Sequence, residues 1–453
     1  MKKKQHPIAA KIPMVLWEIV FNSRTNENAL NFAENKFIEV ERTNLPADNN
    51  QALALLMVCF PDKQLSEYLV HFTQSPKNKI IFTISAAIGR LDILKLLKKN
   101  APDEWIAMVK AKGYSAFRGA TSNGHLDTLK WLKEQAPNKW VAMVKADQYS
   151  AFWEASHNGH LDTLKYLKEQ APDQWVAMIK ANVYAAFRMA SYKGHLDTLK
   201  WLKKQAPNEW LAMVKADDYS AFQMASENGH LDTLKYLKKK APNEWIAMVR
   251  AGRYKAFRDA SMNGHLDTLK WFKEQAPDEW MAMVKADNYY AFYMASSNGH
   301  PDTLKWFKKQ APNEWLAMVK AKDYIAFRWA SSNGHINTLK WFKKQAPNKW
   351  LAMVKANDYF PFRFASSNGH LDTLKWFKEE APNEWVAMVK ADNYHAFRVA
   401  SYMGRLNTLK WLLHQPQCFA YAEDHVQEYS HRVNPFVADT LLTLHQVSTA
   451  IEK

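Results

Sequence analysis

The apolar residues of this chain follow helical spacing, and the same three apolar stripes return every 35 residues. One unit, residues 184–218, shows the stripes in order: Tyr184, Phe187, Ala190 and Ser191; then Leu196, Leu199, Leu202 and Ala206; then Trp210, Met213 and Val214. Residues three or four positions apart share one face of a helix. The pattern therefore predicts three short helices in each unit, over residues 184–193, 195–205 and 207–216.

Glycine marks the boundary between the first and second predicted helices. A Gly-(His/Arg)-Leu-Asp-Thr-Leu-Lys phrase, with small departures, takes ten of the thirteen glycines: Gly89, Gly124, Gly159, Gly194, Gly229, Gly264, Gly299, Gly334, Gly369 and Gly404. Glycine adopts the left-handed backbone that ends many helices. Asn182 is interpreted as the cap of the first helix, while Pro207 and Glu209 suit the first turn of the third.

No helix of such a unit could bury its apolar stripe alone, so neighbouring units must stack. The sequence thus predicts an all-α tandem-repeat solenoid over residues 79–413. The flanking segments 1–78 and 414–453 lack the glycine phrase but keep helical patterns, and we expect them to be helical caps. A degenerate repeat is expected within Gln51–Phe72, Pro13 and Pro61 are expected to interrupt helices, and Pro435 is expected to begin the last helix.

Composition limits the setting of the protein. The chain is 47% hydrophobic, which is typical of folded proteins, and its two cysteines, Cys59 and Cys418, do not form a disulfide framework. No run of about 18 apolar residues occurs, so no membrane-spanning helix is expected. Glu18 interrupts the apolar stretch after the N-terminal lysines, which we interpret as a first helix and not a signal peptide. We expect a monomer in a reducing, cytoplasmic compartment.

The repeated phrases resemble those of the ankyrin-repeat family. The stretch 185–191 corresponds to the family's Thr-Pro-Leu-His-x-Ala-Ala helix opening, and 228–237 corresponds to its Asn-Gly-His-Leu-Glu-Val-Val-x-Leu-Leu phrase. The resemblance covers about residues 79–413 and implies stacked helix pairs that bind proteins, with the first helix of each pair on a concave surface. Ankyrin units span about 33 residues and are joined by a β-hairpin finger. Here the unit is longer, and the predicted helix 207–216 stands in place of that finger.

The Leu-Asp-Thr-Leu-Lys-Trp-Leu phrasing is also similar to ankyrin repeats of intracellular bacteria and giant viruses. Such bacterial proteins are often effectors that are delivered into a host cell. The resemblance therefore implies a protein that is secreted into a host and acts on a host protein.

Comparison of the repeats with one another singles out four variable positions, those of Ala185, Arg188, Met189 and Tyr192, which fall within an arc of about 100° on the first helix. Duplicated repeats could simply drift there, but drift favours small and polar residues. Large aromatic residues and arginine dominate binding hot spots. We therefore predict that a partner protein binds the concave face through Trp153, Tyr192, Tyr290, Tyr293, Arg328, Trp329, Phe360, Phe364, His395 and Tyr402.

Two rows of basic residues support a different hypothesis. One row comprises Lys95, Lys130, Lys165, Lys200, Lys235, Lys270, Lys305, Lys340, Lys375 and Lys410; the other comprises Lys110, Lys145, Lys180, Lys215, Arg250, Lys285, Lys320, Lys355 and Lys390. With a net charge of +16, such ridges could follow nucleic acid or an anionic membrane. Acidic residues at the positions of Asp197 and Glu209 interleave with them, which favours a solvated outer face.

Catalytic, cofactor and metal sites are not expected. The histidines from His125 to His370 recur once per unit, about 10 Å apart, so they cannot converge on zinc, and Arg90 and Arg405 replace them in the end copies. His425, Glu428 and His431 lack the spacing of a metalloprotease motif. An enzyme with a site in an end segment, for example Cys418 with His425, is the remaining alternative. The regular tryptophans, Trp105 to Trp385, are interpreted as core and not as a stacking array for nucleic acid.

Overall fold

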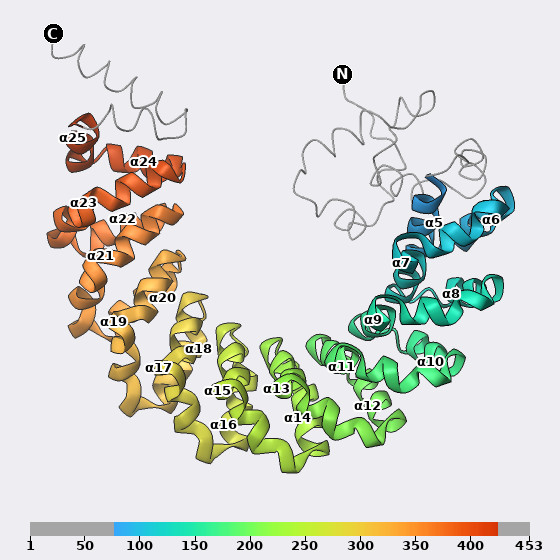
Figure 1. Ribbon diagram of the computed structural model, residues 1–453. Helices are drawn as coiled ribbons and strands as arrows, with labels where there is room; N and C mark the ends of the chain where they lie inside the picture. The colour runs from blue at the N-terminus through green and yellow to red at the C-terminus, as the bar shows by residue number, and fades with distance from the viewer. Residues whose placement is uncertain (1–76, 425–453) are drawn as a thin grey trace, which may run out of the picture. The chain divides into compact units, whose positions relative to one another are not determined.

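The computed structural model describes residues 77–424, which are helical and contain no strand (Figure 1). They fall into two units, one ending at Asp217 and the other beginning at Asp218, and each unit is described by itself. Several expectations concern residues outside the described range: most of the N-terminal cap with Cys59 and the degenerate repeat, Pro435, and the group His425, Glu428 and His431.

In both units, longer odd-numbered helices alternate with shorter even-numbered ones. The first unit contains α5 (Lys77–Ala87), α6 (Leu91–Asn100), α7 (Trp105–Ser122), α8 (Leu126–Gln135), α9 (Trp140–His157), α10 (Leu161–Gln170), α11 (Trp175–Lys193) and α12 (Leu196–Gln205), and α13 (Trp210–Glu227) spans the boundary. The second contains α14 (Leu231–Lys240), α15 (Trp245–Met262), α16 (Leu266–Gln275), α17 (Trp280–Ser297), α18 (Pro301–Gln310), α19 (Trp315–Ser332), α20 (Ile336–Gln345), α21 (Trp350–Asn368), α22 (Leu371–Glu380), α23 (Trp385–Tyr402), α24 (Leu406–Leu413) and α25 (Pro416–Asp424).

A single turn of 3-10 helix precedes each odd-numbered helix from α7 to α23. These turns are Pro102–Glu104, Pro137–Lys139, Pro172–Gln174, Pro207–Glu209, Pro242–Glu244, Pro277–Glu279, Pro312–Glu314, Pro347–Lys349 and Pro382–Glu384. Proline suits this position because its missing N–H has no helical partner in the first turn. The predicted helix 207–216 is therefore confirmed, and no β-hairpin finger occurs within residues 77–424.

A left-handed turn joins the third predicted helix of one unit to the first helix of the next. In α11 the backbone leaves the helix at Ala181, and Asn182, Val183 and Tyr184 then have φ values of 45°, 54° and 56°. The expectation that Asn182 caps the following helix is wrong, because Asn182 lies inside the left-handed turn and the helix resumes only after Tyr184. Its carbonyl accepts a hydrogen bond from Arg188 Nη2 at 2.9 Å. The predicted first and third helices are thus parts of one long odd-numbered element.

The third residue of each left-handed turn is a tyrosine, and in six turns its hydroxyl donates to a side chain of the next repeat. In α17, the Tyr289 hydroxyl donates to Glu314 Oε2 at 2.6 Å, and Lys285 Nζ lies 2.8 Å from Glu314 Oε1. Burial and the adjacent Glu314 carboxylate raise the pKa of Tyr289 to about 12. The strained turn is therefore held by a neutral hydroxyl bonded to a charged acceptor, an interaction stronger than a neutral pair.

The core consists of stacked phenylalanine, leucine and tryptophan side chains. Trp280 is only 7% exposed, and its ring packs edge-on against Phe257 at 5.9 Å and against Trp306 at 5.2 Å. Its equivalent Trp245 donates its indole N–H to the Gln275 carbonyl at 3.1 Å. Apart from the half-buried Trp175, the tryptophan row is core, as predicted. In Trp105, Trp140 and Trp245 the indole N–H also donates to a carbonyl of the next repeat.

The repeated histidines have the structural role that was predicted for them. His265 Nε2 lies 2.9 Å from the Glu227 carbonyl, so this nitrogen must carry the proton. The same imidazole covers the preceding glycine: a Cβ on Gly229 would lie 2.6 Å from His265 Nδ1. Arg405, which replaces histidine, likewise donates through Nε to the Ser367 carbonyl at 3.1 Å. Residues 77–424 contain no group of three or more His, Cys, Asp or Glu side chains able to hold a metal ion.

Candidate partner-binding face

From α7 to α23, the four variable positions lie on the half of each odd-numbered helix that follows the left-handed turn. Five of the ten predicted partner-binding residues meet there in the second unit, and we call them the aromatic cluster: Arg328 and Trp329 of α19, Phe360 and Phe364 of α21, and His395 of α23. The Phe360 and Phe364 rings stack at 3.8 Å, and Trp329 meets Phe360 at 6.1 Å. The Phe364 ring lies 5.5 Å from His395.

The aromatic cluster offers apolar surface to solvent. Trp329 is 41% exposed, and Phe360, Phe364 and His395 are half-buried. The Arg328 guanidinium lies 5.1 Å from the centre of the Phe360 ring, which is within the range of a cation–π interaction. Exposed aromatic rings that are already ordered by one another lose little conformational entropy when a partner covers them.

The imidazole of His395 is the uncharged end of the aromatic cluster. Burial, followed by the charge of Arg363, lowers the pKa of His395 below its usual value of 6.5. Its Nδ1 atom is buried and has no hydrogen-bond partner among the described residues. Near neutral pH this imidazole therefore behaves as an uncharged aromatic ring packed on Phe364.

A tyrosine pair, Tyr290 and Tyr293, adjoins the aromatic cluster on α17. Their rings meet at 4.9 Å, Arg258 lies 4.8 Å above Tyr290, and Lys322 lies 5.2 Å above Tyr293. Tyr293 is only 8% exposed. The expectation that Tyr293 lies on a solvated face is therefore wrong, because the side chain is enclosed by its neighbours.

The remaining predicted residues are spread over both units. Trp153 of α9 and Tyr192 of α11 are half-buried in the first unit, where Tyr192 stacks on His157 at 5.9 Å. Tyr402 is 72% exposed at the last position of α23. The second unit thus contains the contiguous part of the predicted face.

The second variable position has a structural role that sequence comparison missed. Arg188 Nη2 bonds the Asn182 carbonyl of its own turn, and Nη1 lies 2.7 Å from Asp217 of the next turn. The same link to an aspartate one repeat later is made by Arg118, Arg258 and Arg363. Where another residue replaces the arginine, the following aspartate is also replaced, as in the pairs Trp153/Asn182, Gln223/Gly252 and Tyr293/Lys322. Variation here is coupled between repeats and is not simple drift.

Arg328 departs from this coupling. Asn357 stands where the partner aspartate would be, and Arg328 Nη2 instead bonds the Lys322 carbonyl at 2.9 Å. Burial lowers the pKa of Arg328. The charge of Asp323 acts in the opposite direction, but the Arg328 guanidinium forms no ion pair within residues 77–424 and packs on the Phe360 ring instead.

Acidic residues pair with many members of the two basic rows. In the first row, Lys130, Lys165, Lys200, Lys270 and Lys305 lie 2.8–3.7 Å from the aspartate three residues earlier. In the second, Lys180, Arg250, Lys285 and Lys355 pair with a glutamate of the next repeat. This pairing favours the solvated-face interpretation over a continuous ridge for phosphates.

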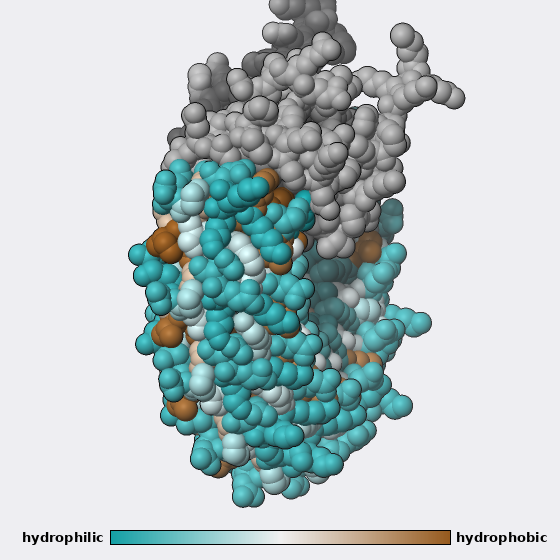
Figure 2. Space-filling view, turned by 90° about the vertical axis from the view of Figure 1, so that its right-hand side faces the viewer, coloured by the Kyte–Doolittle hydropathy of each residue, from teal (hydrophilic) through white to brown (hydrophobic). Residues whose placement is uncertain are grey.

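A row of exposed aliphatic side chains was missed at the sequence level. It comprises Ile106, Val141, Val176 and Leu211 in the first unit and Ile246, Met281, Leu316, Leu351 and Val386 in the second, each 39–54% exposed. Each follows a core tryptophan directly and so lies about 100° from it around the helix. Figure 2 shows a largely hydrophilic face on which apolar residues form separate spots. The signal in the sequence was a position that changes among four aliphatic residues and never becomes polar.

Cys418 does not have the environment of a nucleophile. It is 1% exposed on α25, and burial raises the pKa of its thiol to about 12. The thiolate, which is the reactive form, is therefore strongly disfavoured.

The ankyrin-repeat family model, which describes many copies of the repeat, matches residues 184–237 and 257–307. These two stretches of the chain are ankyrin repeats. Among solved structures, an ankyrin repeat family protein from Legionella pneumophila is 25% identical over 68% of this chain and 96% of its own, with a TM-score of 0.39. No curated protein matches the chain. None of the helices in residues 77–424 has the length and apolar content needed to span a membrane.

Proposed function

We propose that this ankyrin-repeat chain is a protein-interaction scaffold and that the second unit binds its partner through the aromatic cluster. The observation that carries the proposal is the contiguous packing of Arg328, Trp329, Phe360, Phe364 and His395, with Trp329 41% exposed. Tryptophan and arginine are the residue types that most often dominate binding energy at protein interfaces. Ankyrin repeats generally mediate protein–protein interaction, and members of the family are typically not enzymes.

The proposed partner is a host protein, and the chain a secreted effector. The Leu-Asp-Thr-Leu-Lys-Trp-Leu phrasing, similar to that of ankyrin repeats in intracellular bacteria, supports this setting. A eukaryotic cell lysate is therefore the source in which the partner is to be sought.

The test is affinity capture from such a lysate, analysed by mass spectrometry, with a variant carrying Trp329→Met, Phe360→Ser and Phe364→Met. Other repeats of this chain already hold these residues at the equivalent positions, as Met189, Ser220 and Met224. The fold is therefore expected to accept them, and circular dichroism checks that it does. We expect the variant to bind the captured protein at least about tenfold more weakly, because hot-spot substitutions cost about 2 kcal/mol or more.

The aliphatic row supplies the matched control. Leu316→Gln with Leu351→Gln removes exposed apolar side chains from the same two helices, α19 and α21, without touching the aromatic cluster. Retention of the partner by the control and its loss from the cluster variant would support the proposal. Loss from the control alone, or equal capture by all three proteins, would contradict it. Capture that is abolished by moderate salt would point to the basic rows instead.

A further inference from the structure

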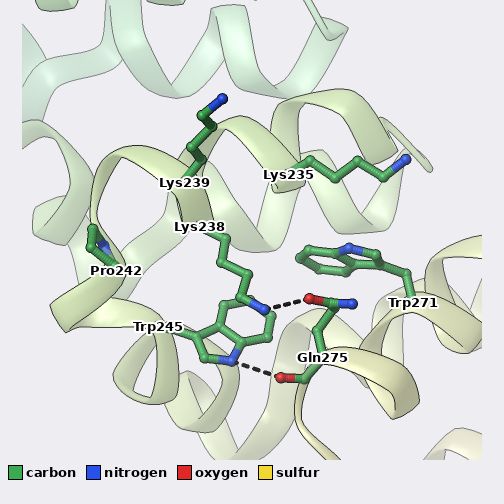
Figure 3. Close-up of a pocket in the computed structure, with 7 residues that line it drawn as sticks. All are labelled: Lys235, Lys238, Lys239, Pro242, Trp245, Trp271 and Gln275. Atoms are coloured by element: carbon green, nitrogen blue, oxygen red, sulfur yellow. Dashed lines mark hydrogen bonds between the residues drawn. The ribbon is translucent and has the colours of Figure 1, made fainter.

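A pocket lies between α14 and α16 in the second unit, away from the aromatic cluster (Figure 3). Its volume is about 440 Å³, which is within the usual size range of small-molecule sites. The lining residues are Lys235, Lys238, Lys239, Pro242, Trp245, Trp271 and Gln275. The lining contains three cations and two indoles and no acidic residue.

The hydrogen-bond acceptors of this pocket are already used. The Gln275 side-chain oxygen accepts from Lys238 Nζ at 2.5 Å, and the Gln275 carbonyl accepts from the Trp245 indole at 3.1 Å (Figure 3). The groups left over are the Gln275 amide nitrogen, the Trp271 indole nitrogen and the Lys235 ammonium, for which the described residues provide no acceptor. A lining that offers donors and no acceptors is suited to a ligand that accepts hydrogen bonds.

The charge of the pocket is likewise uncompensated. Lys238 Nζ lies 4.7 Å from the centre of the Trp245 ring, and burial lowers its pKa. In Figure 3, Lys235 extends over Trp271, Lys238 points toward Gln275, and Lys239 points away from both. In neighbouring repeats the equivalents of Lys235, such as Lys270, are paired with an aspartate. Lys235 forms no such pair within residues 77–424.

The two indoles add the apolar part of the pocket lining. Trp245 and Trp271 meet edge-on at 5.1 Å and are 7% and 6% exposed. Lys238 lies over the Trp245 ring and Phe272 stacks on it at 6.4 Å, so a planar ring in the pocket can contact only the exposed edges of the two indoles. Phosphate esters present three strong acceptor oxygens, one more than a carboxylate, and so can use more of the available donors.

We propose that this pocket binds an aryl phosphate, with Lys235, Lys238 and the Gln275 amide on the phosphate and the indoles against the aromatic body. The pocket is independent of the partner-binding face, since it involves no residue of the aromatic cluster. The shared chemistry admits a free small molecule or a phosphorylated tyrosine side chain, and the experiment separates the two.

The next repeat provides the matched comparison. Its equivalent groove contains Lys270, Lys273 and Glu274, so an acid stands at the position of Lys239, and Lys270 is held 3.0 Å from Asp267. Lys239→Glu therefore reproduces an order of residues that the fold already accepts, and it introduces repulsion of an anion. Lys235→Gln removes one donor and leaves the contacts among Lys238, Trp245 and Gln275 in place.

Isothermal titration of the full chain with phenyl phosphate at constant ionic strength tests the proposal. Inorganic phosphate and a short phosphotyrosine peptide are titrated in parallel. We expect phenyl phosphate to bind about tenfold more tightly than inorganic phosphate. Lys235→Gln should weaken its binding about tenfold through the lost charge-assisted bond, and Lys239→Glu should weaken it about tenfold through repulsion of the anion. Lys270→Gln, the control in the adjacent groove, is expected to leave binding unchanged.

The peptide distinguishes the two sources of the ligand. Tighter binding of the peptide than of phenyl phosphate identifies a phosphotyrosine ligand, and equal or weaker binding identifies a free aryl phosphate. No heat with phenyl phosphate, no preference over inorganic phosphate, or equal losses in Lys235→Gln and Lys270→Gln would each overturn the site. Circular dichroism of all variants shows whether a loss arises from unfolding.

Discussion

At the scale of single residues, the glycine that ends a helix packs against the histidine ring of the next repeat. Gly229 needs a left-handed backbone, with φ of 70°, and also has the His265 ring against its Cα. Gly113 has a comparable φ of 62°, but a Cβ added there would meet nothing within 4 Å. The two positions therefore separate the backbone requirement from the packing requirement.

Gly229→Ala is expected to destabilise the protein more than Gly113→Ala. The left-handed backbone costs an alanine about 1 kcal/mol at either site, while overpacking against His265 adds about 2 kcal/mol at Gly229 alone. Thermal unfolding followed by circular dichroism measures the difference as a lower melting temperature for Gly229→Ala. Equal melting temperatures for the two variants would show that the histidine ring moves aside without cost.

At the scale of elements, the left-handed turn inside each odd-numbered helix from α7 to α23 links successive repeats through coupled positions. Its first residue pairs with the variable position of the preceding repeat, as Asp217 does with Arg188 at 2.7 Å. In another repeat, Tyr293 and Lys322 occupy the positions of Arg188 and Asp217. There the Lys322 ammonium lies 5.2 Å from the centre of the Tyr293 ring. Ion pairing and cation–π stacking thus make the same contact between repeats in different parts of the chain.

Exchange of one pair for the other tests this coupling. Asp217→Lys should destabilise the first unit, because it places a second cation beside Arg188. Adding Arg188→Tyr to that variant should restore about 1 kcal/mol of the free energy of unfolding, because the lysine can form a cation–π interaction with the new tyrosine ring. Denaturant unfolding of the natural protein, the two single variants and the double variant gives the coupling free energy between the two positions. Strictly additive effects would mean that the two positions are independent.

The sequence allowed the elements to be predicted but not the way in which they connect. The 35-residue period, the helix pair and the helix beginning near Pro207 could be recognised because proline, glycine and apolar spacing act locally. The left-handed turn at Asn182, Val183 and Tyr184 was missed because its stability comes from the next repeat, through the bond between Tyr184 and Glu209 at 2.7 Å. The burial of Tyr293 depends in the same way on Lys322, which belongs to the turn that begins the next repeat.

At the scale of the whole chain, the same contacts recur at every interface between repeats. The free energy of unfolding is therefore approximately a sum of the contributions of the repeats and their interfaces. The histidine row is the clearest titratable example. Burial, the largest cause in each case, lowers the pKa of His160, His300, His335 and His370 below 6.5, and neighbouring histidines or Arg405 add to the effect. These side chains are therefore held neutral in the folded protein, each near a carbonyl of the preceding repeat.

This row makes stability depend on pH in a predictable direction. Because the folded pKa values lie below the unfolded value of about 6.5, the unfolded chain binds protons more readily. The contribution of these histidines is complete above pH 6.5 and is lost as the pH falls below it. His335→Arg with His370→Arg removes two titrating groups, and Arg405 shows that arginine can make the same carbonyl bond. Urea unfolding at pH 7.5 and pH 5.5 should show a smaller loss of stability in this variant than in the natural protein. An equal loss in both would place the acid sensitivity outside the histidine row.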